Sequence, residues 1–409
     1  MTSSESRRSG WSGIALLLIF GCTIAMFSFG ARSSFGLLLA PMTEAREWSR
    51  EIFGFALALQ NLVWGIAQPA AGAFAEKYGT ARVLVFGGVL YAIGLVATAW
   101  ADTPLWLDLG AGVLIGLGIA CTSFTIIIAA FGRAVTESQR SIAFGIGMAS
   151  GSLGQFVFAP FSQVLIDNFG WQQTLYVLAA FMLLIPFLVF PLRGKSTPDP
   201  NSTVPEISMK TAISQAFGHK SYLLLAAGFF VCGFQIAFMA VHLPAYIVDI
   251  GLDASVGAWS IAVIGFFNVI GALAAGVIGA KYSKAGALSL LYIARSVVVA
   301  WFILSAPSEL NVLIFSVLLG FLWLSTVPLT SGLVVVMFGP RYMATLFGFV
   351  FLSHQVGSFI GVWLGGWMYD QYQTYDGVWW ISIVLGIFAA IVHWPIREQA
   401  YGTPETASA

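Results

Sequence analysis

The run GIALLLIFGCTIAMFSFGARSSFGLLLA, from Gly13 to Ala40, contains a single charged residue, Arg32. About 20 helical residues cross the hydrocarbon of a bilayer, so a run of this length predicts a membrane-spanning helix with some tilt. Arg32 lies about 12 Å of helix before the end of the run, which places it near the middle of the membrane. A guanidinium group there costs at least about 2.5 kcal/mol, so it must face protein, water or an anion instead of lipid.

Arg32 therefore has two interpretations. In the first, its guanidinium group binds backbone carbonyl groups between helices and only stabilises the fold. In the second, it binds an anion on a transport path. We favour the second, because no predicted span contains an Asp or Glu far from its ends that would pair with it.

The composition excludes a soluble protein. Of the 409 residues, 58% are hydrophobic and only 9% are charged, and the mean hydropathy is +0.88. Long apolar runs follow one another to the C-terminus, which is typical of a polytopic helical membrane protein. Cys22, Cys121 and Cys232 all lie in apolar runs, so we expect no disulfide framework, metal site or cofactor. The net charge of zero gives no indication of a nucleic-acid partner.

We predict an all-α integral membrane protein with twelve transmembrane helices in two six-helix halves. The predicted spans are 13–40, 51–75, 82–101, 105–130, 142–166, 172–192, 221–248, 257–280, 286–305, 309–335, 343–369 and 377–396. The longest polar connection, 193–220, has the composition of a linker. It divides the chain into an N-terminal half (1–192), a cytoplasmic linker (193–220) and a C-terminal half (221–409).

Lysine and arginine residues are concentrated on one side of these spans. Only Arg46 and Arg50 lie on the other side, among acidic residues. The positive-inside rule then predicts a multi-pass protein of the cytoplasmic (inner) membrane, with both termini in the cytoplasm.

The two halves repeat each other. Ala70-Ala71-Gly72 and Lys77-Tyr78 recur 204 positions later as Ala274-Ala275-Gly276 and Lys281-Tyr282. A second repeat pairs 144–154 with 347–357. Repeated six-helix halves are typical of transporters with a substrate site between them, near the midplane.

The run GAFAEKYGTAR, from Gly72 to Arg82, resembles the loop 2–3 signature of the major facilitator superfamily. The resemblance implies a transporter in which Gly72, Glu76, Lys77 and Arg82 belong to a conformational latch at the cytoplasmic ends of the spans. Glu76 stands where the family usually has Asp.

Two further departures concern proton-coupled drug efflux. Gly112 replaces the common Arg of span four, and Pro160 lies too late for the Gly-Pro of the antiporter motif. Both weaken the hypothesis of a drug exporter.

A narrower resemblance is to bacterial relatives of the monocarboxylate and oxalate/formate carriers. It rests on Arg32-Ser33-Ser34-Phe35-Gly36, on Cys232-Gly233-Phe234-Gln235, on the run around His242 and on His354-Gln355. His354 aligns with a span-eleven Lys of the oxalate/formate exchangers. The Asp and Arg that the animal monocarboxylate carriers hold in span eight are missing from residues 266–271 of this chain. The proton mechanism of those carriers is therefore not assigned directly to this chain.

Several polar residues lie at similar depth within the predicted spans. A polar group in hydrocarbon normally faces the bundle interior, so we expect these residues to converge on a central cavity. With Arg32, the predicted substrate-binding residues are Gln60, Asn61, Gln155, Gln235, Asn268, Arg295, His354 and Gln355.

For some of these residues a structural role competes with substrate contact. Gln60 and Asn61 suit interhelical hydrogen bonds equally well. Packing is favoured for Gln155, and a structural role for Arg295. His242 is predicted to be a gating residue, because it lies near the outer end of span seven.

Two tryptophans are further candidates. Trp323 and Trp363 are candidate walls of the cavity, although aromatic residues in spans usually serve packing.

The predicted function is secondary transport of a small organic anion, a monocarboxylate in the first instance, by alternating access and as a monomer. Arg32 would bind the carboxylate with its planar fork, and His354 would add charge or carry a coupled proton. Partners would be the anion, protons as a candidate coupling ion, and membrane lipid.

Two alternatives remain open. The first is a multidrug or hydrophobic-compound exporter of the same fold, which the missing buried acid disfavours. The second is a membrane enzyme or a sensor, for which the spans show no metal-ligand cluster or nucleophile elbow.

Overall fold

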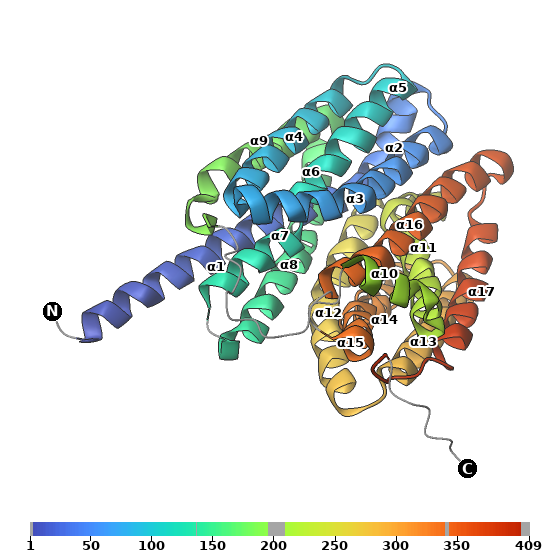
Figure 1. Ribbon diagram of the computed structural model, residues 1–409. Helices are drawn as coiled ribbons and strands as arrows, with labels where there is room; N and C mark the ends of the chain where they lie inside the picture. The colour runs from blue at the N-terminus through green and yellow to red at the C-terminus, as the bar shows by residue number, and fades with distance from the viewer. Residues whose placement is uncertain (1–2, 136, 195–208, 340–342, 402–409) are drawn as a thin grey trace, which may run out of the picture.

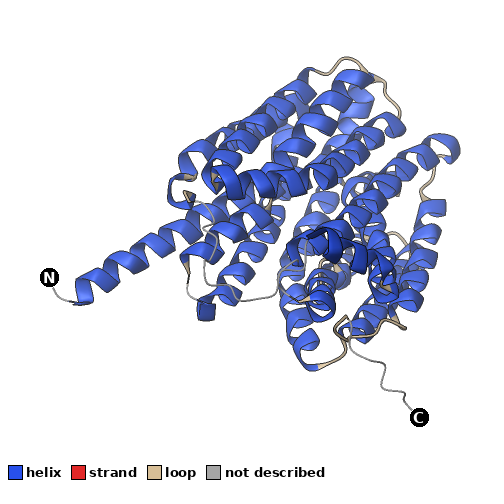
Figure 2. Cartoon of the chain, viewed as in Figure 1, coloured by secondary structure: helices blue, strands red, loops and turns tan. Residues whose placement is uncertain are grey.

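The computed structural model describes residues 3–135, 137–194, 209–339 and 343–401. These residues form helices and contain no strand (Figure 2). The first half comprises α1 (Ser3–Ser33), α2 (Phe35–Arg46), α3 (Arg50–Tyr78), α4 (Thr80–Trp100), α5 (Pro104–Leu107), the π-helix η1 (Asp108–Leu114), α6 (Ile115–Thr122), α7 (Phe124–Ala134), α8 (Glu137–Phe169), α9 (Trp171–Leu188) and the 3-10 turn η2 (Phe190–Leu192). The second half comprises α10 (Met209–Gly218), α11 (Lys220–Asp249), α12 (Ala254–Lys281), α13 (Lys284–Leu304), α14 (Glu309–Leu322), α15 (Thr326–Phe338), α16 (Met343–Tyr372) and α17 (Asp376–His393).

Eleven segments of the described chain are long and apolar enough to cross a membrane. The predicted fifth span, 142–166, lies in α8 and is not among the eleven. This helix has 33 residues and carries the polar residues Ser150, Ser152, Gln155 and Gln163. It nevertheless packs along α1 and α12, as a span of the bundle does (Figure 1).

Three spans that the sequence predicted as continuous are interrupted within their length. The first breaks at Ser34, where the hydroxyl group donates to the carbonyl of Gly30 at 3.1 Å. The fourth breaks at Ser123, whose backbone is extended, and the tenth breaks between α14 and α15 at Trp323. Each break frees backbone groups that need new partners, and within a membrane such a site must be buried in protein or line a cavity.

Each half has its own hydrophobic core. One core is built mainly from α1–α9 and the other from α10–α17. The first core also includes Ala237, Val241, Ala245 and Val362, which come from α11 and α16. Figure 1 shows the two bundles side by side, with α3 next to α16. This packing supports our proposal of two six-helix halves. The predicted linker 193–220 contains α10, whose Ala216 belongs to the second core, and its residues 195–208 lie outside the described residues, so the boundaries at 192 and 221 stay a prediction.

The halves meet closely at one end of the molecule. A Cβ atom on Gly366 of α16 would lie 2.5 Å from the carbonyl oxygen of Arg50, and one on Gly54 would lie 3.1 Å from that of Val362. At the other end, Gly72 and Gly276 have no neighbouring atom within 4 Å of such a position. We therefore call the end near residue 50, where the backbones of the two halves touch, the closed end, and the end near residue 72, where these glycines show no such approach, the open end.

Candidate functional site

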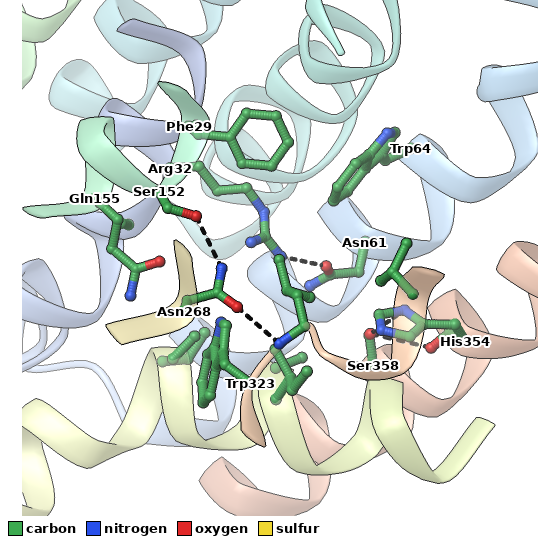
Figure 3. A pocket seen from close by; sticks show the side chains of 18 of the residues that line it. Phe29, Arg32, Asn61, Trp64, Ser152, Gln155, Asn268, Trp323, His354 and Ser358 are labelled. Atoms are coloured by element: carbon green, nitrogen blue, oxygen red, sulfur yellow. Dashed lines mark hydrogen bonds between the residues drawn. The ribbon is translucent and has the colours of Figure 1, made fainter. Parts of the chain in front are cut away.

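A cavity lies between the halves, at the level of the helix breaks. Its wall includes residues of α1, α3, α7 and α8 from the first half and of α11, α12 and α16 from the second. The wall is mostly apolar. Its polar side chains are Arg32, Ser33, Gln60, Asn61, Ser152, Gln155, Asn268, His354 and Ser358 (Figure 3).

Six of the nine predicted substrate-binding residues line this cavity: Arg32, Gln60, Asn61, Gln155, Asn268 and His354. Gln235, Arg295 and Gln355 are not among its lining residues. The sequence analysis did not predict a substrate contact for Ser33, Ser152 or Ser358, because serine is common in spans and bonds readily to its own helix.

Arg32 belongs to the last turn of α1, directly before the break at Ser34. One of its terminal nitrogens, Nη2, donates to Asn61 Oδ1 at 2.8 Å, and its guanidinium carbon lies 5.1 Å from the centre of the Trp64 ring. Asn61 in turn donates from Nδ2 to the carbonyl of Leu57, which leaves its oxygen facing the arginine.

Among the described residues, the positive charge of Arg32 has no acidic partner. Within the part of the chain that the structure describes, no carboxylate forms an ion pair with it, and its Nε is buried without a hydrogen bond. A buried charge is normally paired, so the guanidinium group has unused capacity to bind an anion.

The amide groups around the cavity are largely engaged by the protein. Asn268 donates to Ser152 Oγ at 2.8 Å, across the two halves, and accepts from the backbone N–H of Leu324 at 2.9 Å. Gln155 donates to the carbonyl of Ile261 at 2.9 Å. Gln60 donates to the carbonyl of Ala111 at 2.7 Å. These bonds favour the interhelical role over substrate contact for Gln60, Gln155 and Asn268.

Arg295 has a structural environment. It is 1% exposed and donates to the carbonyls of Leu322, Trp323 (2.9 Å) and the side chain of Gln235 (3.1 Å). Those two carbonyls are freed where α14 ends, and the negative end of a helix dipole suits a cation. Arg295 and Gln235 therefore hold the broken tenth span, and their positions do not support the predicted substrate contact.

His354 lies on the wall between two phenylalanine rings. Its ring centre is 5.7 Å from that of Phe351, nearly parallel, and 4.8 Å from that of Phe229. Its Nδ1 is 3.1 Å from Gln355 Oε1. Gln355 is fully buried behind it and orients the imidazole instead of reaching the cavity.

The closed end is held by a polar network around Arg50, at the start of α3. Its guanidinium group pairs with Asp249 of α11 at 2.5 and 2.7 Å, and donates to the hydroxyl group of Tyr375 at 2.9 Å. It also lies 3.6 Å from the centre of the Tyr369 ring. Asp370 of α16 accepts from the first two N–H groups of α3, at 3.0 and 2.8 Å, and so caps a helix of the other half.

Two aromatic residues lie beside this network. His242 is fully buried and lies 3.2 Å from the hydroxyl group of Tyr375 and 2.8 Å from the carbonyl of Val362. Trp363 donates to Glu51 at 3.0 Å, so it belongs to the closed end, whereas Trp323 lines the cavity. The gating role predicted for His242 remains a prediction that its position next to Tyr375 supports.

The latch motif lies at the open end. Within the described residues, Glu76 and Lys77 form no ion pair. Thr80 donates its backbone N–H to Gly194 and receives a bond from Arg133 of α7. In this arrangement the contacts of Thr80 stay within the first half and the start of the predicted linker, and the gating roles of Gly72, Glu76, Lys77 and Arg82 stay predictions.

The family profile and the related proteins agree on one family of membrane transporters. A sequence profile of the Major Facilitator Superfamily matches residues 21–362. An uncharacterized MFS-type transporter, YcxA of Bacillus subtilis, is 24% identical over 96% of this chain and 97% of its own length. Monocarboxylate transporter 13 of Rattus norvegicus is 24% identical over 94% of this chain and 88% of its own.

Solved structures agree on the fold. A bacterial homolog of the human lysosomal transporter Spinster, in an inward-facing and unoccupied conformation, superposes with a TM-score of 0.74 at 15% identity. The match covers 93% of this chain and 96% of that one. The predicted fold and family are thereby confirmed, and the chain belongs to the major facilitator superfamily of membrane transporters.

Proposed function

We propose that this transporter carries a small organic anion, a monocarboxylate in the first instance. The observation that carries the proposal is the cavity-lining guanidinium group of Arg32, which has no acidic partner among the described residues. Its other contacts, an amide oxygen and the face of Trp64, hold the group in place without neutralising it. The two oxygens of a carboxylate would accept hydrogen bonds from this guanidinium group and offset the cost of removing its charge from water. The monocarboxylate transporters among the relatives are in keeping with this substrate class.

Transport would follow alternating access. The cavity lies between two bundles that touch at the Arg50 end, whereas Gly72 and Gly276 at the other end have no neighbouring atom within 4 Å of an added Cβ. Rocking one half against the other would exchange the open side. One chain supplies both halves of the cavity wall, so we propose a monomer as the functional unit.

We further propose that the open end faces the cytoplasm of the inner membrane. The basic residues support this orientation, because they gather at the open end while Arg50 stands among acidic residues at the closed end. The described state would then be the inward-open one.

The function is tested by a binding titration of the purified protein with matched pairs of carboxylates and their neutral methyl esters. Because a hydrogen bond to a charged group contributes about 1.5–3 kcal/mol, each acid should bind about 10- to 150-fold more tightly than its ester. A lipophilic cation such as tetraphenylphosphonium should not compete. Equal binding of acids and esters, or displacement by the cation, would favour the alternative of a hydrophobic-compound exporter.

His354 is proposed to carry the proton coupling, because no carboxylate of the described chain lines the cavity. His354→Gln keeps the hydrogen-bonding capacity but does not titrate near neutrality. We expect the variant to lose the dependence of initial transport rate on pH between about 5.5 and 8, measured in proteoliposomes. A wild-type pH profile in this variant would assign the proton to another group, such as the substrate itself.

A further inference from the structure

Five of the aromatic rings that line the cavity form one group, which the imidazole of His354 completes. This aromatic collar consists of Phe29, Trp64, Phe229, Phe347 and Phe351, all of which line the cavity. The ring centres of Phe29 and Trp64 are 6.1 Å apart, and those of Trp64 and Phe351 are 5.3 Å apart, both edge to face. His354 connects Phe351 to Phe229, whose ring lies 6.0 Å from that of Phe347. The collar thus crosses from one half of the protein to the other.

The collar lies next to Arg32, on the side of the open end. Phe29 precedes Arg32 by one turn of α1, and Trp64 follows Asn61 by one turn of α3, each about 4.5 Å along the helix. Since α1 runs from the open end and α3 runs toward it, both rings are displaced from the guanidinium group toward that end. Figure 3 shows the Phe29 and Trp64 rings on one side of the guanidinium group, with Asn268 on the other. An anion bound at Arg32 would therefore have its body against the collar.

The collar offers no hydrogen bond to that body. Four of its members are phenylalanines, and the indole N–H of Trp64 already donates to Gln68 at 2.8 Å. A hydroxyl or amino group placed against these five rings, away from the imidazole of His354, would lose its hydration without compensation. Within the described wall there is also no carboxylate to hold an ammonium group, which disfavours amino acids.

From this geometry we propose that the preferred substrate is a monocarboxylate that carries an unsubstituted aromatic ring, seated in the aromatic collar. The proposal rests on the proposed function. Edge-to-face contacts between rings contribute beyond the buried area, so a phenyl ring should be preferred over a saturated ring of the same size. A short aliphatic acid would leave the collar unfilled.

The test is a binding titration with phenylacetate, cyclohexylacetate, acetate and methyl phenylacetate. We expect phenylacetate to bind about two- to tenfold more tightly than cyclohexylacetate, and acetate to bind most weakly of the three acids. Phe351→Leu should remove most of the preference for the phenyl ring, and Phe347→Leu serves if that variant is not monodisperse. Phe86→Leu is the matched control, because Phe86 lies on α4, is 61% exposed and does not line the cavity.

The outcomes separate the two proposals. Tighter binding of cyclohexylacetate or acetate, or an unchanged phenyl preference in Phe351→Leu, would overturn the aromatic substrate while leaving the anion proposal in place. If methyl phenylacetate binds as tightly as phenylacetate, the carboxylate contributes nothing and both proposals are overturned.

Discussion

Arg32→Gln is expected to reduce the affinity for a carboxylate substrate at least about 100-fold, while the purified protein remains monodisperse. The substitution removes the charged half of a charge-assisted, two-pronged hydrogen bond in a site of low polarity. It should not impair folding, because among the described residues Arg32 donates one side-chain hydrogen bond, to Asn61, and loss of a midplane charge lowers the cost of membrane insertion. Arg32→Lys keeps the charge but not the planar fork, so an intermediate loss of about tenfold is expected.

The matched control is Arg46→Gln. Arg46 resembles Arg32 in contacting a tryptophan ring, that of Trp171 at 5.5 Å, and in having a buried Nε without a partner, but it does not line the cavity. Its substitution should leave affinity unchanged. If Arg32→Gln binds the acids almost normally, or if it aggregates while the surviving protein keeps wild-type affinity, Arg32 is structural and the main support for an anionic substrate is lost.

The positions of the polar residues along the predicted spans were enough to predict a central cavity. They did not distinguish the residues that line the cavity from those that hold the surrounding helices together. Arg32 and Arg295 both lie well inside apolar runs, and sequence depth alone treats them alike. What separates them is the break at Trp323, which supplies two free carbonyls to Arg295. In the sequence the tenth predicted span is a continuous apolar run. The two free carbonyls therefore could not be predicted from it and are found only in the packed structure.

The aromatic collar illustrates a second limit. The chain contains 34 phenylalanines and 14 tryptophans, and most aromatic residues in membrane spans pack against other helices or lipid. No local pattern marks Phe29, Phe229 and Phe351 as members of one group, because they come from α1, α11 and α16. Arg50 did carry a signal in the sequence, since a basic residue among the acidic residues on one side of the predicted spans favours an ion pair.

Arg50 is expected to control the opening of the outer side. In the described state it joins the start of α3 to Asp249, Tyr369 and Tyr375 of the other half, and its side chain is only 14% exposed. These contacts cannot survive the separation of the halves at this end. Breaking a charge pair that is this shielded costs roughly 2–3 kcal/mol, which would shift the equilibrium toward the outward-open state about 30- to 150-fold.

The shift can be followed with a cysteine at Met148, which lines the cavity on α8. In intact cells, an impermeant maleimide should label Met148→Cys slowly in the wild-type background, and much faster when Arg50→Met is added. The unsubstituted chain gives the background from Cys22, Cys121 and Cys232. Arg46→Met is the matched control, since its ring contact, with Trp171, stays within the first half.

Charge-reversal variants test whether the ion pair between Arg50 and Asp249 itself controls the labelling. Arg50→Asp alone should place two carboxylates together and increase labelling further, whereas Arg50→Asp combined with Asp249→Arg should restore part of the slow labelling by re-forming the pair across the halves. Rapid labelling of Met148→Cys without any change at Arg50 would contradict the proposed orientation, because the open end would then face outward. Unchanged labelling in Arg50→Met and Arg50→Asp would mean that the packing of α3 against α16 closes this end without the ion pair.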